Sequence, residues 1–78
     1  MSDDYKKFTH EEIKEMTFKV TTLDGQQRDR VRERLYRLHD QLGGMISRRT
    51  LHLELLKMKE AFEISEVDMH NIEAVFYG

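Results

Sequence analysis

The chain has 78 residues, of which 38% are hydrophobic and 36% charged, with a formal net charge of −2 and neither cysteine nor proline. Its length indicates one domain, which we place at 8–78 behind a polar tail at 1–7 that we expect to be disordered. Without cysteine there can be no disulfide and no thiolate metal site. No apolar run resembles a signal sequence or a membrane span, so the expected setting is cytoplasmic, with no membrane partner.

The N-terminal part of the domain predicts a capped helix. Thr9 and Glu12 have the spacing of a capping box, in which each side chain bonds the backbone amide of the other residue. The apolar residues that follow keep helical spacing, and we expect a helix over about 10–22. Residues 17–22 are rich in β-branched side chains, so an extended segment is the alternative there.

The middle of the chain predicts two helices that reverse at a glycine pair. A second helix over about 26–42 follows from one apolar stripe, formed by Val31, Leu35, Leu38 and Leu42. Gly43 and Gly44 permit a left-handed cap and a tight turn. Ser47 is the expected N-cap of a third helix that ends near Glu63, and Thr50 is the alternative cap. We therefore expect the second and third helices to form an antiparallel hairpin.

The last part of the chain predicts that third helix and a short fourth one. The third helix carries one main apolar stripe, formed by Leu51, Leu55, Met58 and Phe62. Further apolar residues widen this stripe, namely Leu53, Leu56 and Ala61. Ser65 and Asp68 repeat the capping signal and begin the fourth helix. The expected fold is all-α, a compact bundle of about four helices with a central antiparallel helical hairpin.

The charge of the chain is strongly segregated. Residues 26–49 hold all seven arginines against three acids, a net charge of +4, whereas residues 50–78 hold two lysines against six acids, a net charge of −4. Helical spacing puts most of the arginines outside the apolar stripe, in two rows that consist of Arg30, Arg34 and Arg37 and of Arg28 and Arg32. With Arg48 and Arg49, which follow the glycine turn, they are our candidate partner- or phosphate-binding residues.

An arginine-rich face of this kind suits a negatively charged partner, because guanidinium groups bind carboxylates and phosphates in a bidentate manner. We expect a small non-enzymatic interaction or regulatory module that uses this face, or an apolar groove, to bind a protein partner or a second copy of itself. A nucleic-acid-associated protein that contacts phosphates through the same arginines is the alternative. The competing interpretation is that Asp29, Glu33 and the acidic last third of the chain neutralise the arginines.

No residue pattern indicates an enzyme, a cofactor or a metal. The chain has no phosphate-binding glycine loop and no histidine next to a candidate nucleophile. Its four histidines, His10, His39, His52 and His70, fall on different predicted elements. We therefore expect no catalytic residues, no cofactor and no metal site.

One stretch resembles the helix–loop–helix of the EF-hand family. Gly44 matches the turn glycine at loop position six and Ile46 the apolar position eight, and residues 8–13 resemble the start of such a domain. The positions that would bind calcium hold no carboxylate, since they are occupied by His39, Gln41, Gly43 and Thr50. The resemblance implies at most a metal-free pair of helices, and we assign no family from it.

Overall fold

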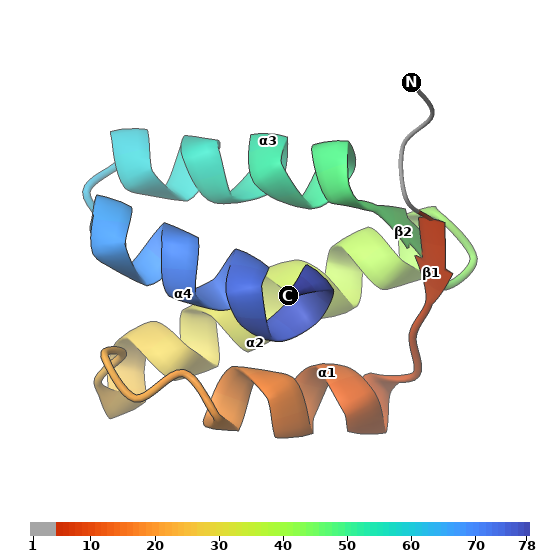
Figure 1. Ribbon diagram of the computed structural model, residues 1–78, viewed down its shortest axis with the longest axis horizontal. Coiled ribbons are helices and arrows are strands. Elements are labelled where there is room, and N and C mark those ends of the chain that lie inside the picture. The colour runs from red at the N-terminus through yellow and green to blue at the C-terminus, as the bar shows by residue number, and fades with distance from the viewer. Residues whose placement is uncertain (1–4) are drawn as a thin grey trace.

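The computed structural model describes residues 5–78, and it has four helices and a two-stranded sheet (Figure 1). In chain order the elements are β1 (Tyr5–Lys7), α1 (His10–Phe18), α2 (Gly25–Gln41), β2 (Met45–Ser47), α3 (Arg48–Glu60) and α4 (Glu66–Tyr77). The predicted four helices are confirmed, and the short sheet was missed. None of the helices described over residues 5–78 is long and apolar enough to cross a membrane.

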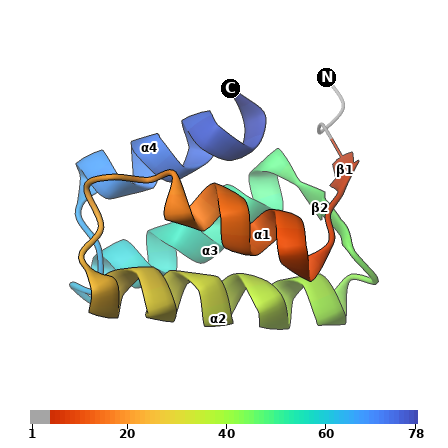
Figure 2. The same ribbon diagram turned by 90° about the horizontal axis from the view of Figure 1, so that it is seen from below.

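The helices contact one another mainly as two pairs, α1 with α2 and α3 with α4, and α1 also touches α4 (Figures 1 and 2). The predicted hairpin of the second and third helices is not confirmed, because the contacts of α2 lie with α1 and those of α3 with α4. Each pair is connected by a short segment, so the helices within it pack as neighbours along the chain.

The sheet joins residues that are about forty positions apart. Strand β1 pairs with β2 in antiparallel register, with Tyr5 opposite Ser47, Lys6 opposite Ile46 and Lys7 opposite Met45. The expectation of a disordered tail is wrong for residues 5–7, which pair with β2, and residues 1–4 lie outside the described residues. A strand of three exposed residues has no alternating pattern of its own, and its existence depends on its distant partner.

Helix α1 begins as predicted and ends early. The capping box of Thr9 and Glu12 is present in full, with both side chains bonded to backbone amides. The helix stops at Phe18, and residues 19–24 form turns, neither the predicted helix nor the extended alternative. The reason lies in the next helix, because the Arg28 guanidinium donates hydrogen bonds to backbone carbonyls within this turn segment.

The turn between α2 and β2 has the predicted left-handed geometry. Gly43 and Gly44 have φ angles of 65° and 88°, which residues with a side chain adopt only with strain. The Gly44 amide donates to the His39 carbonyl at 2.8 Å, and its carbonyl accepts from the Phe8 amide at 2.9 Å. Ser47 caps α3 as expected, accepting from the amide of Thr50.

The core forms where the apolar faces of all four helices meet. It consists of Phe8, Ile13, Val20, Leu23, Val31, Leu35, Leu38, Ile46, Leu51, Leu55, Met58, Ile64, Met69, Ile72, Phe76 and Tyr77. Most of the predicted stripe residues lie there. The predictions for Leu42, Leu53, Ala61 and Phe62 are wrong, because all four are exposed.

Phe62 departs furthest from its predicted role. Helix α3 ends at Glu60, and Phe62 follows it with a φ of 61°, the only positive φ outside glycine among the described residues. This conformation turns the side chain outward and leaves it 95% exposed. A bulky residue in the left-handed region is destabilised by about 1–2 kcal/mol relative to glycine, and here no packing contact offsets that cost.

We predict that Phe62→Gly stabilises the protein by about 1 kcal/mol, which raises Tm by about 4–8 °C. Thermal unfolding followed by circular dichroism measures the change. Phe62→Ala is the matched control, since it removes the same ring and keeps the strained φ, and it should leave Tm nearly unchanged. A Tm for Phe62→Gly at or below that of the alanine variant would contradict this account.

Helix α4 begins at a capping box formed by Ser65 and the buried Asp68. The Ser65 hydroxyl accepts from the Asp68 amide at 3.1 Å, and the Asp68 carboxylate accepts from the Ser65 amide at 3.0 Å. Burial alone would raise the pKa of Asp68. The hydrogen bonds from Thr22 and from the backbone and side chain of Ser65 outweigh it, so the pKa lies below its ordinary value of 3.8. The carboxylate therefore stabilises the folded state.

We predict that Asp68→Asn costs about 1 kcal/mol of stability at neutral pH, because the charge at the helix N-terminus is lost. A depressed folded pKa contributes stability above the unfolded value and loses it as pH falls through the folded value. The difference between wild type and Asp68→Asn should therefore be constant near neutrality and shrink below pH 3.8. Urea titrations across this range test it, and a difference that grows on acidification would refute the assignment.

Candidate functional site

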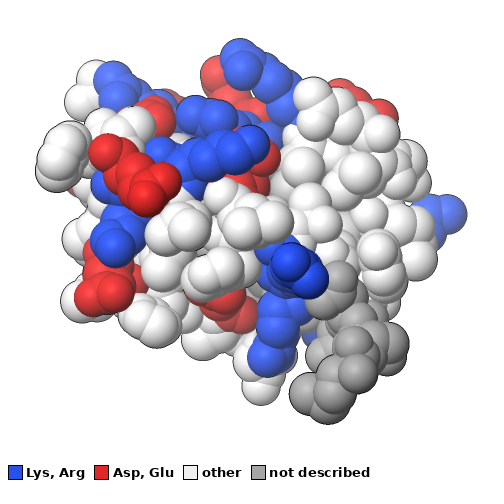
Figure 3. Space-filling view, turned by 90° about the horizontal axis from the view of Figure 1, so that it is seen from above, with Lys and Arg blue, Asp and Glu red and all other residues white. Residues whose placement is uncertain are grey.

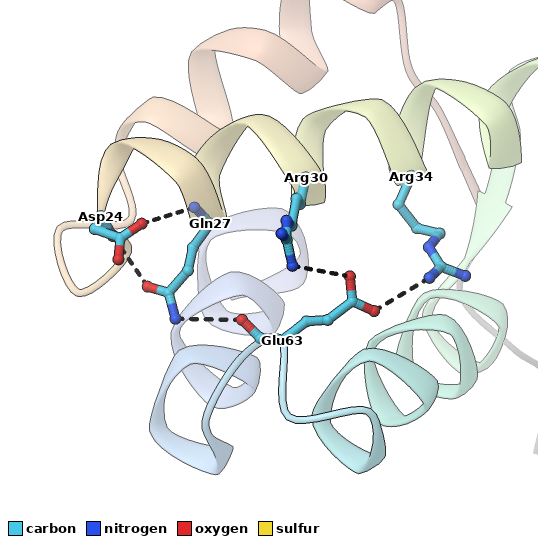
Figure 4. Close-up of polar contacts among 5 residues, drawn as sticks. All are labelled: Asp24, Gln27, Arg30, Arg34 and Glu63. Atoms are coloured by element: carbon cyan, nitrogen blue, oxygen red, sulfur yellow. Dashed lines mark hydrogen bonds and ion pairs between the residues drawn. The ribbon is translucent and has the colours of Figure 1, made fainter.

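Glu63 is the contact point between α2 and the segment that joins α3 to α4 (Figure 4). Its carboxylate lies 3.9 Å from Arg30 and 3.4 Å from Arg34, and its backbone carbonyl accepts from the Gln27 side chain at 3.2 Å. Gln27 is itself held by the capping box that it forms with Asp24 at the start of α2. We call Glu63 with Gln27, Arg30 and Arg34 the Glu63 clamp.

Arg34 extends this contact from the clamp to helix α3. It lies 3.1 Å from the Glu54 carboxylate as well as 3.4 Å from that of Glu63. Both carboxylates belong to the acidic last third of the chain, and both are mostly buried. The basic and acidic blocks are therefore partly neutralised by each other.

Two other arginines of α2 are engaged locally. The Arg28 guanidinium bonds the carbonyls of Val20 and Leu23, each at 3.2 Å, and lies 5.0 Å from the centre of the Phe18 ring. Its Nε is buried and has no hydrogen-bond partner among the described residues. Arg32 forms an ion pair at 3.0 Å with Asp29, as the helical spacing predicts. Arg28 is therefore a structural residue of the loop.

Arg48 holds the end of the last helix. Its guanidinium donates to the Tyr77 carbonyl at 2.7 Å and lies 5.6 Å from the Tyr77 ring centre. Lys6 of β1 donates to the neighbouring Phe76 carbonyl at 3.2 Å. Cations at a helix C-terminus interact favourably with its unpaired carbonyls, so both side chains stabilise α4.

The remaining two candidates, Arg37 and Arg49, are exposed and make no hydrogen bond or ion pair with any described residue. Arg37 of α2 lines a hollow of about 220 Å³ together with Lys57 of α3, which also lacks a described partner. Arg34 and Glu54 line the same hollow and neutralise each other. The uncompensated positive charge of this hollow therefore belongs to Arg37 and Lys57.

The hollow is one of three that adjoin along α2. Arg34 and Arg37 are shared with a second hollow of about 180 Å³, which Glu33 also lines. Arg30 and Glu63 connect that hollow to a third, of about 220 Å³, beside Phe62. Seen from the α3 side, basic and acidic side chains intermix over one half of the surface, and the other half is largely uncharged (Figure 3). The arginine face of α2 therefore carries charges of both signs, and its excess positive charge lies at Arg37 and Lys57.

The apolar groove that we considered has one candidate, a hollow of about 390 Å³ on α1. Its lining comes from a single helix, with Phe18 as its apolar member and Glu11, Lys14, Glu15 and Lys19 around it. The Phe18 side chain is 69% exposed, and Arg28 covers part of its ring. This hollow is an indentation beside one aromatic ring and is not a groove between elements.

The structure brings together two histidines that we had expected to lie apart. His10 Nε2 lies 2.9 Å and His39 Nδ1 3.0 Å from the same oxygen of Asp40. The hydrogen bond from His39, followed by that from His10, lowers the pKa of the Asp40 carboxyl below its ordinary value. His10 begins α1 and His39 lies in the last turn of α2, so antiparallel packing of these two helices joins them. We had instead expected the second helix to pair with the third.

No family model, curated protein or solved structure matches this chain. The EF-hand resemblance therefore stays a local likeness of the glycine turn and its flanking helices. Any function has to be argued from the contacts and exposed groups of this protein itself.

We predict that Glu63→Gln destabilises the protein by about 1 kcal/mol, because the pairs of Glu63 with Arg30 and Arg34 are only partly shielded from solvent. The variant keeps the backbone carbonyl that Gln27 bonds. Glu60→Gln is the matched control, since Glu60 is exposed and makes no contact of this kind among residues 5–78. Urea unfolding should separate the two at low salt and bring them together at about 1 M salt, where charges are screened. Equal stability of both variants at low salt would mean that the Glu63 carboxylate does not stabilise the fold.

Proposed function

We propose that this protein is a non-enzymatic interaction module that binds a segment of a partner protein carrying an apolar and an acidic side chain. The proposed binding surface, which we call the docking face, consists of Phe62, Arg30, Arg37 and Lys57. The observation that carries this proposal is the position of Phe62, a large apolar side chain that is 95% exposed at a strained backbone position.

The Phe62 amide donates to the Lys59 carbonyl at 3.0 Å and closes the end of α3, but the ring, 95% exposed, contributes almost no buried surface. Backbone strain of this kind costs about 1–3 kcal/mol and concentrates at functional sites. Transfer of the ring into an apolar pocket of a partner would contribute about 1.5–3 kcal/mol, which is comparable with the strain. Helix α3 ends just before Phe62 and the Glu63 clamp follows directly after it, so the ring is presented from a fixed backbone. A rigid aromatic of this kind can bind with little loss of conformational entropy.

The charged end of the docking face favours a carboxylate. Arg37 and Lys57 have no described acidic partner, and Arg30 is only loosely paired, at 3.9 Å from Glu63. Arg37 follows Arg30 by seven residues, so the two lie about 10 Å apart along α2. Aromatic and arginine side chains dominate the energetics of protein interfaces. The partner segment should therefore present an apolar side chain to Phe62 and a carboxylate to the cations of α2 and α3.

Nucleic acid fits this surface less well. Five of the seven arginines contact carboxylates, carbonyls or rings of the protein itself, namely Arg28, Arg30, Arg32, Arg34 and Arg48. Binding to a phosphate backbone depends on neutralising several phosphates with free cations. Arg37 and Arg49 are the two arginines left without such a contact among residues 5–78, in a chain of net charge −2. Nucleic-acid binding is therefore the less favoured alternative, and the experiment below distinguishes it from binding to a protein.

We test this proposal with a photo-reactive benzoylphenylalanine at position 62, irradiated in an extract of the source cells. A cross-linked partner should appear, and mass spectrometry should place the attachment in a segment that contains Asp or Glu. Adding Arg37→Glu to the same protein should lower the yield about tenfold, because a central interface arginine contributes about 1.4 kcal/mol or more. Arg49→Glu is the matched control, exposed and unpaired but away from the docking face, and should leave the yield unchanged.

The other outcomes are decisive as well. No cross-link, or a yield that Arg37→Glu leaves unchanged, would overturn the docking face. A cross-link to this same chain, together with a dimer in sedimentation, would replace the foreign partner by a second copy. Retention of DNA or RNA in a low-salt gel shift, lost equally in Arg37→Glu and Arg49→Glu, would establish the phosphate-binding alternative instead.

A further inference from the structure

His10, His39 and Asp40 form a cluster of donor atoms at the end of the molecule where α1 begins and α2 ends. His10 Nε2 and His39 Nδ1 lie 2.9 Å and 3.0 Å from the same Asp40 oxygen, and all three donor atoms lie within 4.8 Å of one another. A tetrahedral zinc ion with bonds of about 2.0–2.2 Å holds its donors about 3.3 Å apart. The Asp40 oxygen therefore already lies close to zinc-site spacing from both imidazole nitrogens.

Local structure sets the position of His10. It is the first residue of α1, directly after the capping box of Thr9 and Glu12. Its ring stacks on that of Tyr36 from α2, with centroids 4.3 Å apart and an angle of 17° between the planes. The cap fixes the backbone and the stacked ring fixes the imidazole plane, so Nε2 is directed at Asp40.

His39 is held in a different way, by the glycine turn. The amide of Gly44 bonds the His39 carbonyl, and a Cβ at Gly44 would lie only 3.2 Å from His39 Nε2. The imidazole therefore packs against bare backbone on one side, and only 21% of the side chain is exposed. This packing leaves Nδ1 as the nitrogen that faces Asp40. Both histidines are thus oriented by groups that are not themselves metal ligands.

We propose that His10 Nε2, His39 Nδ1 and a carboxylate oxygen of Asp40 bind a divalent transition metal ion, with zinc as the ion that fits best. Two imidazoles and one carboxylate form a ligand set that suits zinc and its neighbours. Calcium prefers an all-oxygen site and is not expected here. On binding, each imidazole gives its nitrogen lone pair to the metal and keeps its proton on the other ring nitrogen, and a proton displaced from the donor atoms goes to solvent.

The site would have room for a further ligand. The side chains of His10 and Asp40 are 48% and 65% exposed, so one side of the cluster opens to solvent. With three protein ligands, a tetrahedral ion keeps one position for water or for a group from another molecule. The ion would also join α1 to the last turn of α2, and so it should stabilise the fold.

The test uses tag-free protein and zinc chloride. Isothermal titration calorimetry should show one zinc bound per chain, and at a free zinc concentration 100 times Kd the Tm should rise by about 10–20 °C. His10→Ala and Asp40→Asn, which alter exposed side chains, should each weaken binding about tenfold or more. His70→Ala is the matched control, because His70 is exposed and outside the cluster, and it should bind as wild type does.

A spectroscopic readout keeps the test decisive even if a variant folds poorly. In wild-type protein, zinc should shift the imidazole NMR signals of His10 and His39 and leave those of His52 and His70 in place, and calcium should shift none of them. The proposal is overturned if zinc neither binds nor raises Tm. It is also overturned if both variants bind as wild type does, or if the shifted signals belong to His52 or His70.

Discussion

The Glu63 clamp is the contact on which the arrangement of the molecule depends. The helices contact one another mainly as the pairs α1–α2 and α3–α4, and polar contacts at the two ends, with the packing of α1 on α4, set how the two pairs lie together. At one end of the molecule this contact is made by Glu63, which lies in the turn before α4. Its carboxylate pairs with Arg30 and Arg34 of α2, and its carbonyl accepts from Gln27. At the other end the pairing of β1 with β2 and the hydroxyl of Tyr77, which bonds the carbonyl of Ile46, close the structure. The apolar core lies between these two sets of polar contacts.

This arrangement changes the meaning of the segregated charge. A block of arginines followed by an acidic block suggests a basic surface that awaits a ligand. In the folded protein, Arg34 pairs with Glu54 and Glu63, and Arg48 donates to the Tyr77 carbonyl at the end of α4. Long arginine side chains reach such groups across helix boundaries, so segregation along the chain becomes complementarity in space. What remains for recognition on the docking face is small: Arg37, Lys57, the loosely paired Arg30 and the exposed ring of Phe62.

The features that could be predicted from the sequence are those decided within a few residues. The caps at Thr9, Ser47 and Ser65 and the left-handed glycines depend on local hydrogen bonds, and each was found where expected. Strand β1 could not be predicted, because its pairing partner lies about forty residues away. Phe62 misled because its spacing continues the stripe of α3, although the helix has already ended. The pairing of His10 with His39 was missed because it depends on which helices become neighbours.

The closure near the strands has a consequence for how the chain folds. Lys6 bonds the carbonyl of Phe76, seventy residues further along, and the Phe8 ring lies 5.4 Å from that of Phe76. Contacts within each helix pair close short loops, whereas this contact has to close almost the whole chain and carries a larger entropic cost. The two helix pairs should therefore form first and the strand end last. The same end should open first during native-state fluctuations, while the half of the molecule around Glu63 stays closed.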